Sequence, residues 1–153
     1  MSKALDKLNE QLTAHMEVIL RCTVESEKYG RLLLASPPAS RYPYIYPRDT
    51  NCAVQLFRRL AGSDRGYDAG PQAFELMKSM AHFIKDVVSE NGNWGQRYNL
   101  EGEDKSLYKQ EDNVAHGAAI ICNYLLTAHR LNQPVDDLQS LINAIEKALR
   151  HAL

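Results

Sequence analysis

The sequence predicts an all-α fold built from about five amphipathic helices. Apolar residues recur at intervals of three and four over most of the 153 residues, which is helical spacing, and no strand-length alternation of comparable strength is found. Hydrophobic residues make up 44% of the chain and charged residues 24%, as in ordinary globular proteins. The length fits one domain, so we expect the helices to pack on one another as a single unit.

The first expected helix carries one apolar stripe on an otherwise charged surface: Leu5, Leu8, Leu12, Met16, Ile19 and Leu20. We expect it to end near Gly30, where a glycine can form a C-cap. A second helix should begin at Asp49 or Thr50, either of which can cap it. Its inward residues are expected to be Ala53, Leu56, Phe57 and Leu60. The segment from Gly62 to Gly66 predicts a turn.

Three more helices follow. The third is expected to start near Pro71, to end at Asn91-Gly92-Asn93, and to bury Phe74, Met77, Ala81, Ile84 and Val88. The fourth is expected to bury Val114, Ala118, Ile121 and Leu125. The fifth begins after Pro134, with Asp136 or Asp137 as its cap, and carries Leu138, Leu141, Ile145 and Leu149.

Two connections, residues 31–47 and 91–111, are long, polar and aromatic, whereas the other two are short. Because long and short connections alternate, the long ones should gather at one end of the helical array. Long loops in a compact domain are usually functional, so we expect a site at that end.

The first long loop places three tyrosines, at 42, 44 and 46, directly before Arg48 and Asp49. Tyrosine presents a flat apolar face and a hydroxyl, which suits a sugar ring. Arg48 supplies donors and Asp49 an acceptor, so the pair can hold adjacent hydroxyls of a pyranose. On spacing alone the simpler interpretation is favoured: Asp49 caps the helix and the tyrosines pack the loop.

The second long loop holds the only tryptophan, Trp94, among glycines and polar residues. This residue is either a lid packed on the core or a stacking platform for a ligand. Gln110 and Asp112 precede the fourth helix, where we expect them to point toward the same end as Arg48 and Asp49. Asp112 can also act simply as a helix cap.

Together these segments resemble two motifs of the glucoamylase-type glycoside hydrolases (family 15). The first is Ala35-Ser36-Pro37 followed by Tyr44-Ile45-Tyr46-Pro47-Arg48-Asp49. The second is Gly92-Asn93-Trp94-Gly95-Gln96-Arg97-Tyr98 followed by Gly102 and Gln110-Glu111-Asp112. The resemblance extends from about Leu5 to Leu149. It departs at Tyr46, where the family most often has tryptophan, and at Asn113, where many members have an acidic residue or glycine.

The resemblance implies that residues 1–153 are the N-terminal portion of an (α/α)6 barrel, an incomplete toroid with substrate loops at one end. It implies an inverting, exo-acting enzyme that releases glucose from α-glucosidic oligo- or polysaccharides, of glucoamylase, glucodextranase, isomaltose- or trehalose-hydrolysing type. By the same resemblance, Arg48 and Asp49 grip the innermost glucose, Tyr46 lines that subsite and Trp94 borders the sugar. Gln110 and Asp112 match the second motif as further substrate-binding residues.

No catalytic residue is expected within the chain. Inverting hydrolysis needs two carboxyl groups about 6.5–9.5 Å apart, and the acid and base implied by the resemblance fall beyond Leu153. We therefore expect no hydrolysis by this chain alone and an exposed apolar face on its last helix. Three interpretations stay open: a fragment of a longer hydrolase, half of a split barrel completed by a C-terminal chain or by self-association, and a non-catalytic carbohydrate-binding or regulatory and assembly module.

Charge and composition argue against other classes of protein. A formal net charge of -1 gives no electrostatic reason to expect a nucleic-acid or anionic-membrane partner, and no apolar run is long enough to span a bilayer. No metal or cofactor is expected, since the histidines are scattered and Cys22, Cys52 and Cys122 lie far apart. We expect these cysteines to be buried and reduced, and a cytoplasmic location because no signal peptide is visible.

Overall fold

The computed structural model describes residues 3–62 and 69–152. The expected turn at 62–66 lies outside the described residues except for Gly62, and the side chain of Leu5 is not described either. In chain order the elements are α1 (Lys3–Leu20), β1 (Thr23–Ser26), β2 (Gly30–Leu33), α2 (Pro47–Ala61), α3 (Gly70–Asp86), α4 (Asn113–Arg130) and α5 (Leu138–Ala152). None of the described helices is long and apolar enough to cross a membrane.

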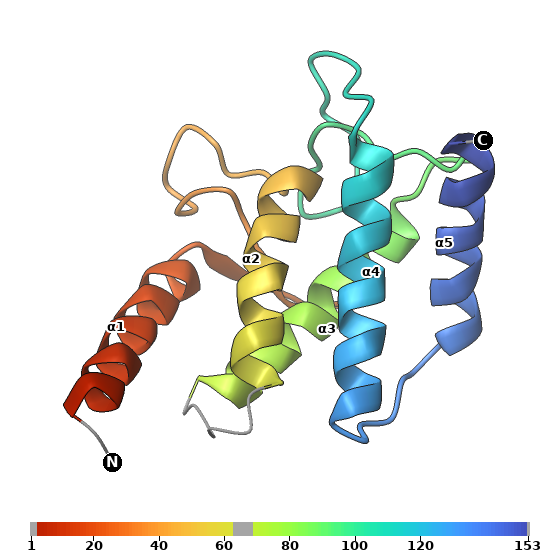
Figure 1. Cartoon of the computed structure of the whole chain (residues 1–153). Coiled ribbons are helices and arrows are strands. Elements are labelled where there is room, and N and C mark those ends of the chain that lie inside the picture. The colour runs from red at the N-terminus through yellow and green to blue at the C-terminus, as the bar shows by residue number, and fades with distance from the viewer. Residues whose placement is uncertain (1–2, 63–68, 153) are drawn as a thin grey trace.

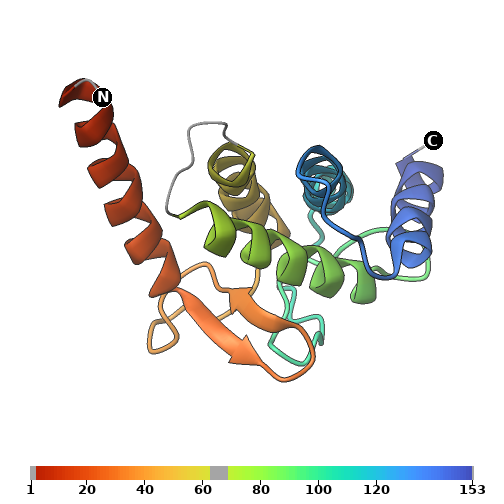
Figure 2. The same ribbon diagram turned by 90° about the horizontal axis from the view of Figure 1, so that it is seen from below.

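The centre of the fold is formed by α2 and α4, which lie side by side and run in the same direction (Figure 1). Helix α3 crosses behind both and packs on each of them, and the β1–β2 hairpin covers the far side of α3 (Figure 2). Helix α5 packs on α4 and α3, whereas α1 stands at the opposite edge of the molecule. The helices are therefore layered, with α2 and α4 in one layer and α3 behind them.

The core lies where α2, α3 and α4 meet. Its largest fully buried side chains on these helices are Phe57, Leu76, Met77, Met80, Phe83, Ile84, Ile120, Ile121 and Tyr124. Their spacing of three and four residues confirms the helical periodicity on which the sequence prediction rested. Not every residue expected to face inward is fully buried. Ala53 and Leu56 of α2, Phe74 of α3 and Val88 just beyond it are only half-buried. The same holds for Val114, Ala118 and Leu125 of α4, because contacts with α2, α3 and α5 bury the adjacent face that carries Ile120 and Tyr124.

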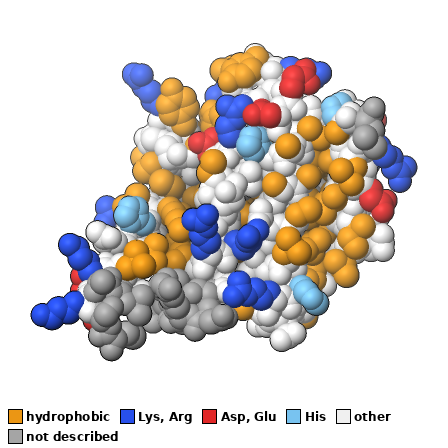
Figure 3. Space-filling view, viewed as in Figure 1, with side chains coloured by type: hydrophobic (Ala, Val, Ile, Leu, Met, Phe, Trp, Pro, Cys, Tyr) orange, Lys and Arg blue, Asp and Glu red, His pale blue; other side chains and the backbone are white. Residues whose placement is uncertain are grey.

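Helix α5 buries Leu141 together with two alanines, Ala144 and Ala148. The small alanine side chains form the contact face, so Leu138 and Leu149 of the expected stripe stay 47% and 56% exposed. Leu126 of α4 is 60% exposed as well, and apolar atoms gather over α4 and α5 on the face seen in Figure 3. The apolar face expected on this helix is thus present.

The all-α prediction is wrong in one respect, because a two-stranded hairpin follows α1. The first helix ends at Leu20, and Thr23–Ser26 pairs antiparallel with Gly30–Leu33. Gly30, expected as a helix C-cap, has a φ of +78° beside the hairpin turn instead. The strands are held by burial against α3: Leu32 is fully buried, and the backbone N–H of Leu33 donates to Sδ of Met80 at 3.2 Å.

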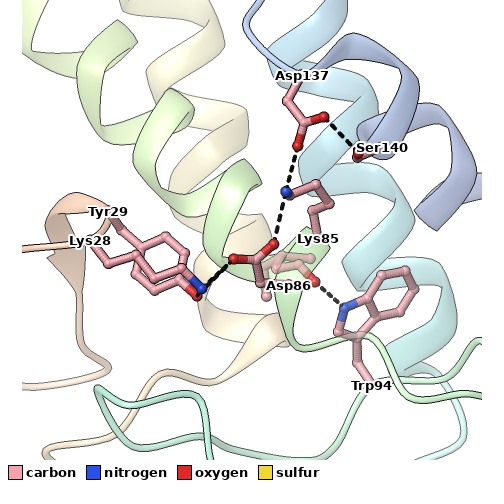
Figure 4. A network of polar contacts seen from close by, with 8 residues as sticks. Lys28, Tyr29, Lys85, Asp86, Trp94, Asp137 and Ser140 are labelled. Carbon is pink, nitrogen blue, oxygen red and sulfur yellow. Dashed lines mark hydrogen bonds and ion pairs between the residues drawn. The ribbon is translucent and has the colours of Figure 1, made fainter.

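An ion-pair network ties the hairpin to α3 and α5 (Figure 4). The carboxylate of Asp86, the last residue of α3, accepts from Lys28 at 2.6 Å and from Lys85 at 2.8 Å. Lys85 also reaches Asp137, 2.7 Å away, whose carboxylate accepts from the hydroxyl of Ser140 in α5. We call this network the clasp; its five residues are Lys28, Lys85, Asp86, Asp137 and Ser140. Because α3 ends at Asp86, well before the expected stop at Asn91, the clasp sits at the end of the helix.

Candidate functional site

The long connections, residues 34–46 and 87–112, both lie at the end of the molecule where α2 and α4 begin (Figure 1). An isolated antiparallel bridge joins them: Ile45 and Tyr98 exchange two backbone hydrogen bonds of 2.9 Å. Both residues are buried, so the bridge is anchored in the core. The expectation that the long loops gather at one end is confirmed, although residues 31–33 belong to β2.

Helix α2 begins earlier than expected. Tyr46 occupies the N-cap position and Pro47 the first helical position, where proline's fixed φ and missing N–H are well tolerated. Asp49 and Thr50 are therefore not caps; they lie in the first turn, and the N–H of Thr50 donates to the carbonyl of Tyr46 at 2.9 Å. The simpler interpretation of Asp49 as a helix cap is thereby excluded.

The first turns of α2 and α4 are joined by an ion pair. Nη2 of Arg48 lies 2.6 Å from Oδ2 of Asp112, which occupies the N-cap position of α4 without capping it through its side chain. The same oxygen lies 3.3 Å from Nε2 of His116, and Nδ1 of His116 lies 3.1 Å from the amide nitrogen of Asn51. Two side-chain contacts thus link α2 to α4, and the contact between Asp112 and His116 connects them. We call the four residues the polar ring: Arg48, Asn51, Asp112 and His116.

The pKa of Asp112 lies below its usual value. Partial desolvation on its own raises this pKa, but hydrogen bonds from Arg48, Gln110 and His116, together with the charge of Arg48, outweigh that effect. The carboxylate is therefore held in its ionised form at neutral pH. Gln110 lies beside it, so the second motif places both of its polar residues close to Arg48.

A hollow of about 380 Å³ opens beside this ring, between the two long loops. Its lining residues come from both loops and from the first turn of α2: Ala35, Tyr42, Tyr46, Asp49, Gln96, Arg97 and Leu107. Asp49 has no hydrogen bond or ion pair to any described residue, whereas Arg48 pairs with Asp112. Arg48 therefore pairs across the helices with Asp112 and not with the adjacent Asp49, and Asp49 lines the hollow.

Trp94 is packed in the interior rather than in this hollow. Only 2% of it is exposed, and its indole Nε1 donates to the carbonyl of Ile84 at 2.7 Å (Figure 4). The ring lies against Gly117 of α4 so closely that a Cβ added there would sit 2.3 Å from it. Of the two interpretations of this residue, packing on the core is the one realised; contact with a bound sugar stays a prediction.

A second hollow, of about 420 Å³, lies within the loop before α4. Polar side chains dominate its lining, among them Ser89, Asn91, Asn93, Ser106 and Gln110. Gln96 lines both hollows, and its Oε1 accepts from the N–H of Leu107 at 3.1 Å. The two hollows are thus neighbours separated by Gln96 and Leu107.

Four site residues were not singled out from the sequence. Asn51 and His116 complete the polar ring, but each lies in a helix with nothing local to mark it. Gln96 and Arg97 belong to the motif around Trp94, yet no role was assigned to them. The sequence offered one signal for these two residues. They lie two and three positions after Trp94, the tryptophan that fixes the loop to the core.

No family model matches the chain, and no curated protein or solved structure is significantly similar to it. Within residues 3–62 and 69–152, no three His, Cys, Asp or Glu side chains are grouped so as to hold a metal ion. The cysteines are unpaired, and Cys52 is exposed while Cys22 and Cys122 are half-buried, which corrects the expectation of three buried thiols.

Proposed function

We propose that the chain supplies the glucose-binding part of an inverting, exo-acting α-glucosidase built on an (α/α)6 barrel. The observation that carries this proposal is the hollow at the start of α2, which is lined by tyrosines and by Asp49, a carboxylate with no hydrogen bond or ion pair to a described residue. The resemblance to family 15 glycoside hydrolases predicts a glucose subsite that includes two of the residues lining this hollow, Tyr46 and Asp49.

The chemistry of the hollow suits a sugar. Tyr42 and Tyr46 offer apolar ring faces for the C–H faces of a pyranose and hydroxyls for its edge. Asp49 is free to accept hydrogen bonds from two sugar hydroxyls, and the amide of Gln96 adds a further polar group. Arg48 lies one residue away and joins the first turn of α2 to the start of α4 through its ion pair with Asp112.

The helix arrangement is compatible with a barrel segment. In an (α/α)6 barrel, parallel inner helices alternate in sequence with outer helices that run the other way. Here α2 and α4 are parallel neighbours, and α3, which connects them in sequence, runs back behind them (Figure 1). The apolar surface over α4 and α5, with Leu126 and Leu149 exposed, is where we place the contact with a completing C-terminal chain or a second copy.

Hydrolysis by the chain alone is not part of the proposal. Among the described residues Asp49 is the one carboxylate that lines the hollow. Glu103 and Glu111 are exposed and paired with Lys105 and Lys109, and neither lines the hollow together with Asp49. The pair of groups needed for inversion must come from elsewhere.

The same observation favours a second candidate function, a non-catalytic carbohydrate-binding or regulatory and assembly module. A single carboxylate with tyrosines is sufficient for binding and insufficient for inverting hydrolysis. The two candidates differ in whether the site acquires a catalytic carboxyl pair when the barrel is complete. Under either, we place the chain in the cytoplasm, where unpaired cysteines stay reduced.

The test is sugar binding by the purified chain, measured by titration calorimetry and ligand-observed NMR. We expect saturable binding of maltose, isomaltose or trehalose, much weaker binding of the β-linked cellobiose, and no release of glucose. Absence of binding to all three α-linked disaccharides would refute both candidates. Glucose release by the chain alone would refute the proposal that the catalytic carboxyl pair lies outside this chain.

A further inference from the structure

We propose that the ligand of the hollow is an α-glucoside that carries a negatively charged group, with Arg97 holding the anion and Asp49 the sugar hydroxyls. The inference rests on the proposed function and adds to it the chemical class of the substrate. It is drawn from the fixed position of Arg97 and from the charges that line the hollow.

The guanidinium of Arg97 is held in place by three groups. Nε donates to the carbonyl of Lys105 at 2.7 Å, Nη1 donates to the hydroxyl of Tyr46 at 3.3 Å, and Cζ lies 4.5 Å from the ring centroid of Tyr44. A guanidinium carries five N–H donors, so three of them have no partner among the described residues. The side chain is therefore oriented in advance, and most of its donors remain available.

Arg97 also lacks a counter-ion among the described residues. Three described arginines pair with carboxylates: Arg31 with Glu25, Arg48 with Asp112 and Arg150 with Glu146. Arg58 instead donates to the side-chain amide oxygen of Asn123. Arg97 forms no such ion pair within the part of the chain that the structure describes. Asp49 lines the same hollow, yet it does not lie within ion-pair distance of Arg97.

The hollow thus presents a positive group that is held in place, Arg97, and a negative group, Asp49, that do not form an ion pair with each other. Sugar hydroxyls can donate to Asp49, but a neutral sugar leaves Arg97 facing only hydroxyl oxygens. A carboxylate or phosphate accepts two parallel hydrogen bonds from a guanidinium, and charge strengthens both. A volume of about 380 Å³ is enough for a small glycoside with such a substituent.

The experiment compares two glucosides that differ in one terminal group, which is charged in the first and neutral in the second. In maltobionate and in maltitol a glucose is α-linked to the same open-chain residue, which ends in a carboxylate in the first and in a hydroxymethyl group in the second. We expect the purified chain to bind maltobionate about tenfold more tightly than maltitol, as measured by titration calorimetry. We expect this preference to shrink between about 20 mM and about 500 mM NaCl, because salt screens a partly exposed charge pair.

Variants assign the effect to Arg97. Arg97→Gln should lose the preference for maltobionate over maltitol, while Arg97→Lys should retain part of it. Arg31→Gln, which removes an exposed arginine of the hairpin, is the matched control and should keep the whole preference. Should Arg97→Gln fail to fold, the salt dependence of the unsubstituted protein decides the question.

Three results would overturn the inference. Equal affinity for the two glucosides would refute it and leave the proposed sugar site standing. Binding of gluconate alone as tightly as maltobionate would show a simple anion site and refute recognition of the sugar. Absence of binding to either glucoside, and to maltose, would refute the inference together with the proposed function.

Discussion

Arg48 and Asp112 are 64 residues apart in sequence, and their side chains meet at 2.6 Å across the first turns of two parallel helices. The pair lies at the end of the molecule where both long loops converge. Each side chain is about half exposed, so the contact is too well solvated to hold the fold together. It joins the first turns of α2 and α4 at the end of the molecule where the hollow lies.

The first prediction concerns this ion pair. Arg48→Ala should lower Tm by less than about 3 °C, because exposed ion pairs contribute little to stability. The same substitution should weaken maltose binding by about tenfold or more, since the first turn of α2 carries Asp49 into the hollow. Thermal unfolding and titration calorimetry on one preparation measure both effects.

Arg31→Ala is the control for that substitution, because it breaks a comparable pair with Glu25 in the hairpin. It should match Arg48→Ala in Tm and leave maltose affinity unchanged. An unchanged affinity in Arg48→Ala, or a large loss of Tm, would contradict the role assigned to the pair.

The second prediction concerns the packing of Trp94 on Gly117. Gly117→Ala places a methyl group 2.3 Å from the indole ring, and both groups lie in the interior. The ring or α4 must shift, so we expect a loss of about 2–3 kcal/mol in the free energy of unfolding despite alanine's higher helix propensity. Urea unfolding followed by the emission of the single tryptophan measures it.

Ala115→Leu enlarges an exposed residue on the same helix and should change stability by less than about 0.5 kcal/mol. If Gly117→Ala were as stable as the unsubstituted protein, the ring could not be packed as the structure has it.

The third prediction is a loss of stability on mild acidification that depends on His82. Desolvation lowers the pKa of His82, with Lys85 and Lys78 adding to the effect, and its Nε2 is buried without a partner among the described residues. In the unfolded chain histidine titrates near about 6.5. The unfolded state therefore binds the proton more readily, and the unfolding free energy should fall as pH drops from about 7.5 through 6.5 toward the lower folded pKa.

His82→Phe keeps an aromatic ring beside Tyr124 and removes the titrating group. Urea unfolding across pH 5.0 to 7.5 should give a flatter profile for this variant, whereas His15→Gln on exposed α1 should follow the unsubstituted protein. Identical slopes for His82→Phe and the unsubstituted protein would show that another group carries the dependence.

A fourth prediction concerns the clasp at lower pH. Burial raises the pKa of Asp86, but hydrogen bonds from Lys28, Lys85 and Tyr29 outweigh it and leave the pKa below its usual value of 3.8. The stability contributed by this carboxylate is therefore present above about pH 4 and lost as pH falls through the lowered folded pKa. Asp86→Asn should have a lower free energy of unfolding than the unsubstituted protein at pH 6. The difference between the two free energies should become smaller below pH 4. A difference that stays constant would contradict the assignment.

The helices were predictable because their signal is local. Stripes such as Met77, Ala81 and Ile84 repeat within one element, and their burial follows from that repeat. The hairpin was not predictable in the same way, since each strand has four residues and shows too little alternation to register. What stabilises it is the burial of Leu32 against α3, a contact with residues that are distant in sequence.

In the candidate site, too, local features were predictable from the sequence, whereas contacts between distant segments were not. Alternating loop lengths correctly placed both long loops at one end, and the tyrosines with Asp49 were identified from one segment. The ion-pair partner of Arg48 could not be identified from one segment. Asp49 is adjacent to it in sequence, whereas Asp112 comes close only when α2 and α4 are side by side. Arg97 is likewise brought against Tyr44 and Tyr46 by the bridge between the loops.

The last prediction separates Asp49 from its neighbours. Asp49 is exposed, lies in the first turn of α2 and forms no hydrogen bond or ion pair with a described residue through its carboxylate, so the described fold does not depend on it for a hydrogen bond. A negative charge near a helix N-terminus adds a small stabilisation of about 0.3–1 kcal/mol that Asp49→Asn removes. The same change takes away the charged acceptor for sugar hydroxyls.

We therefore expect Asp49→Asn to unfold within about 1 kcal/mol of the unsubstituted protein while losing about tenfold or more in maltose affinity. Asp6→Asn, in the first turn of α1, is the matched control for the helix effect and should leave maltose affinity unchanged. Titration calorimetry and urea unfolding of the two variants make the comparison. Maltose affinity retained in Asp49→Asn would place the sugar elsewhere on the protein, because no other carboxylate of the described chain lines this hollow.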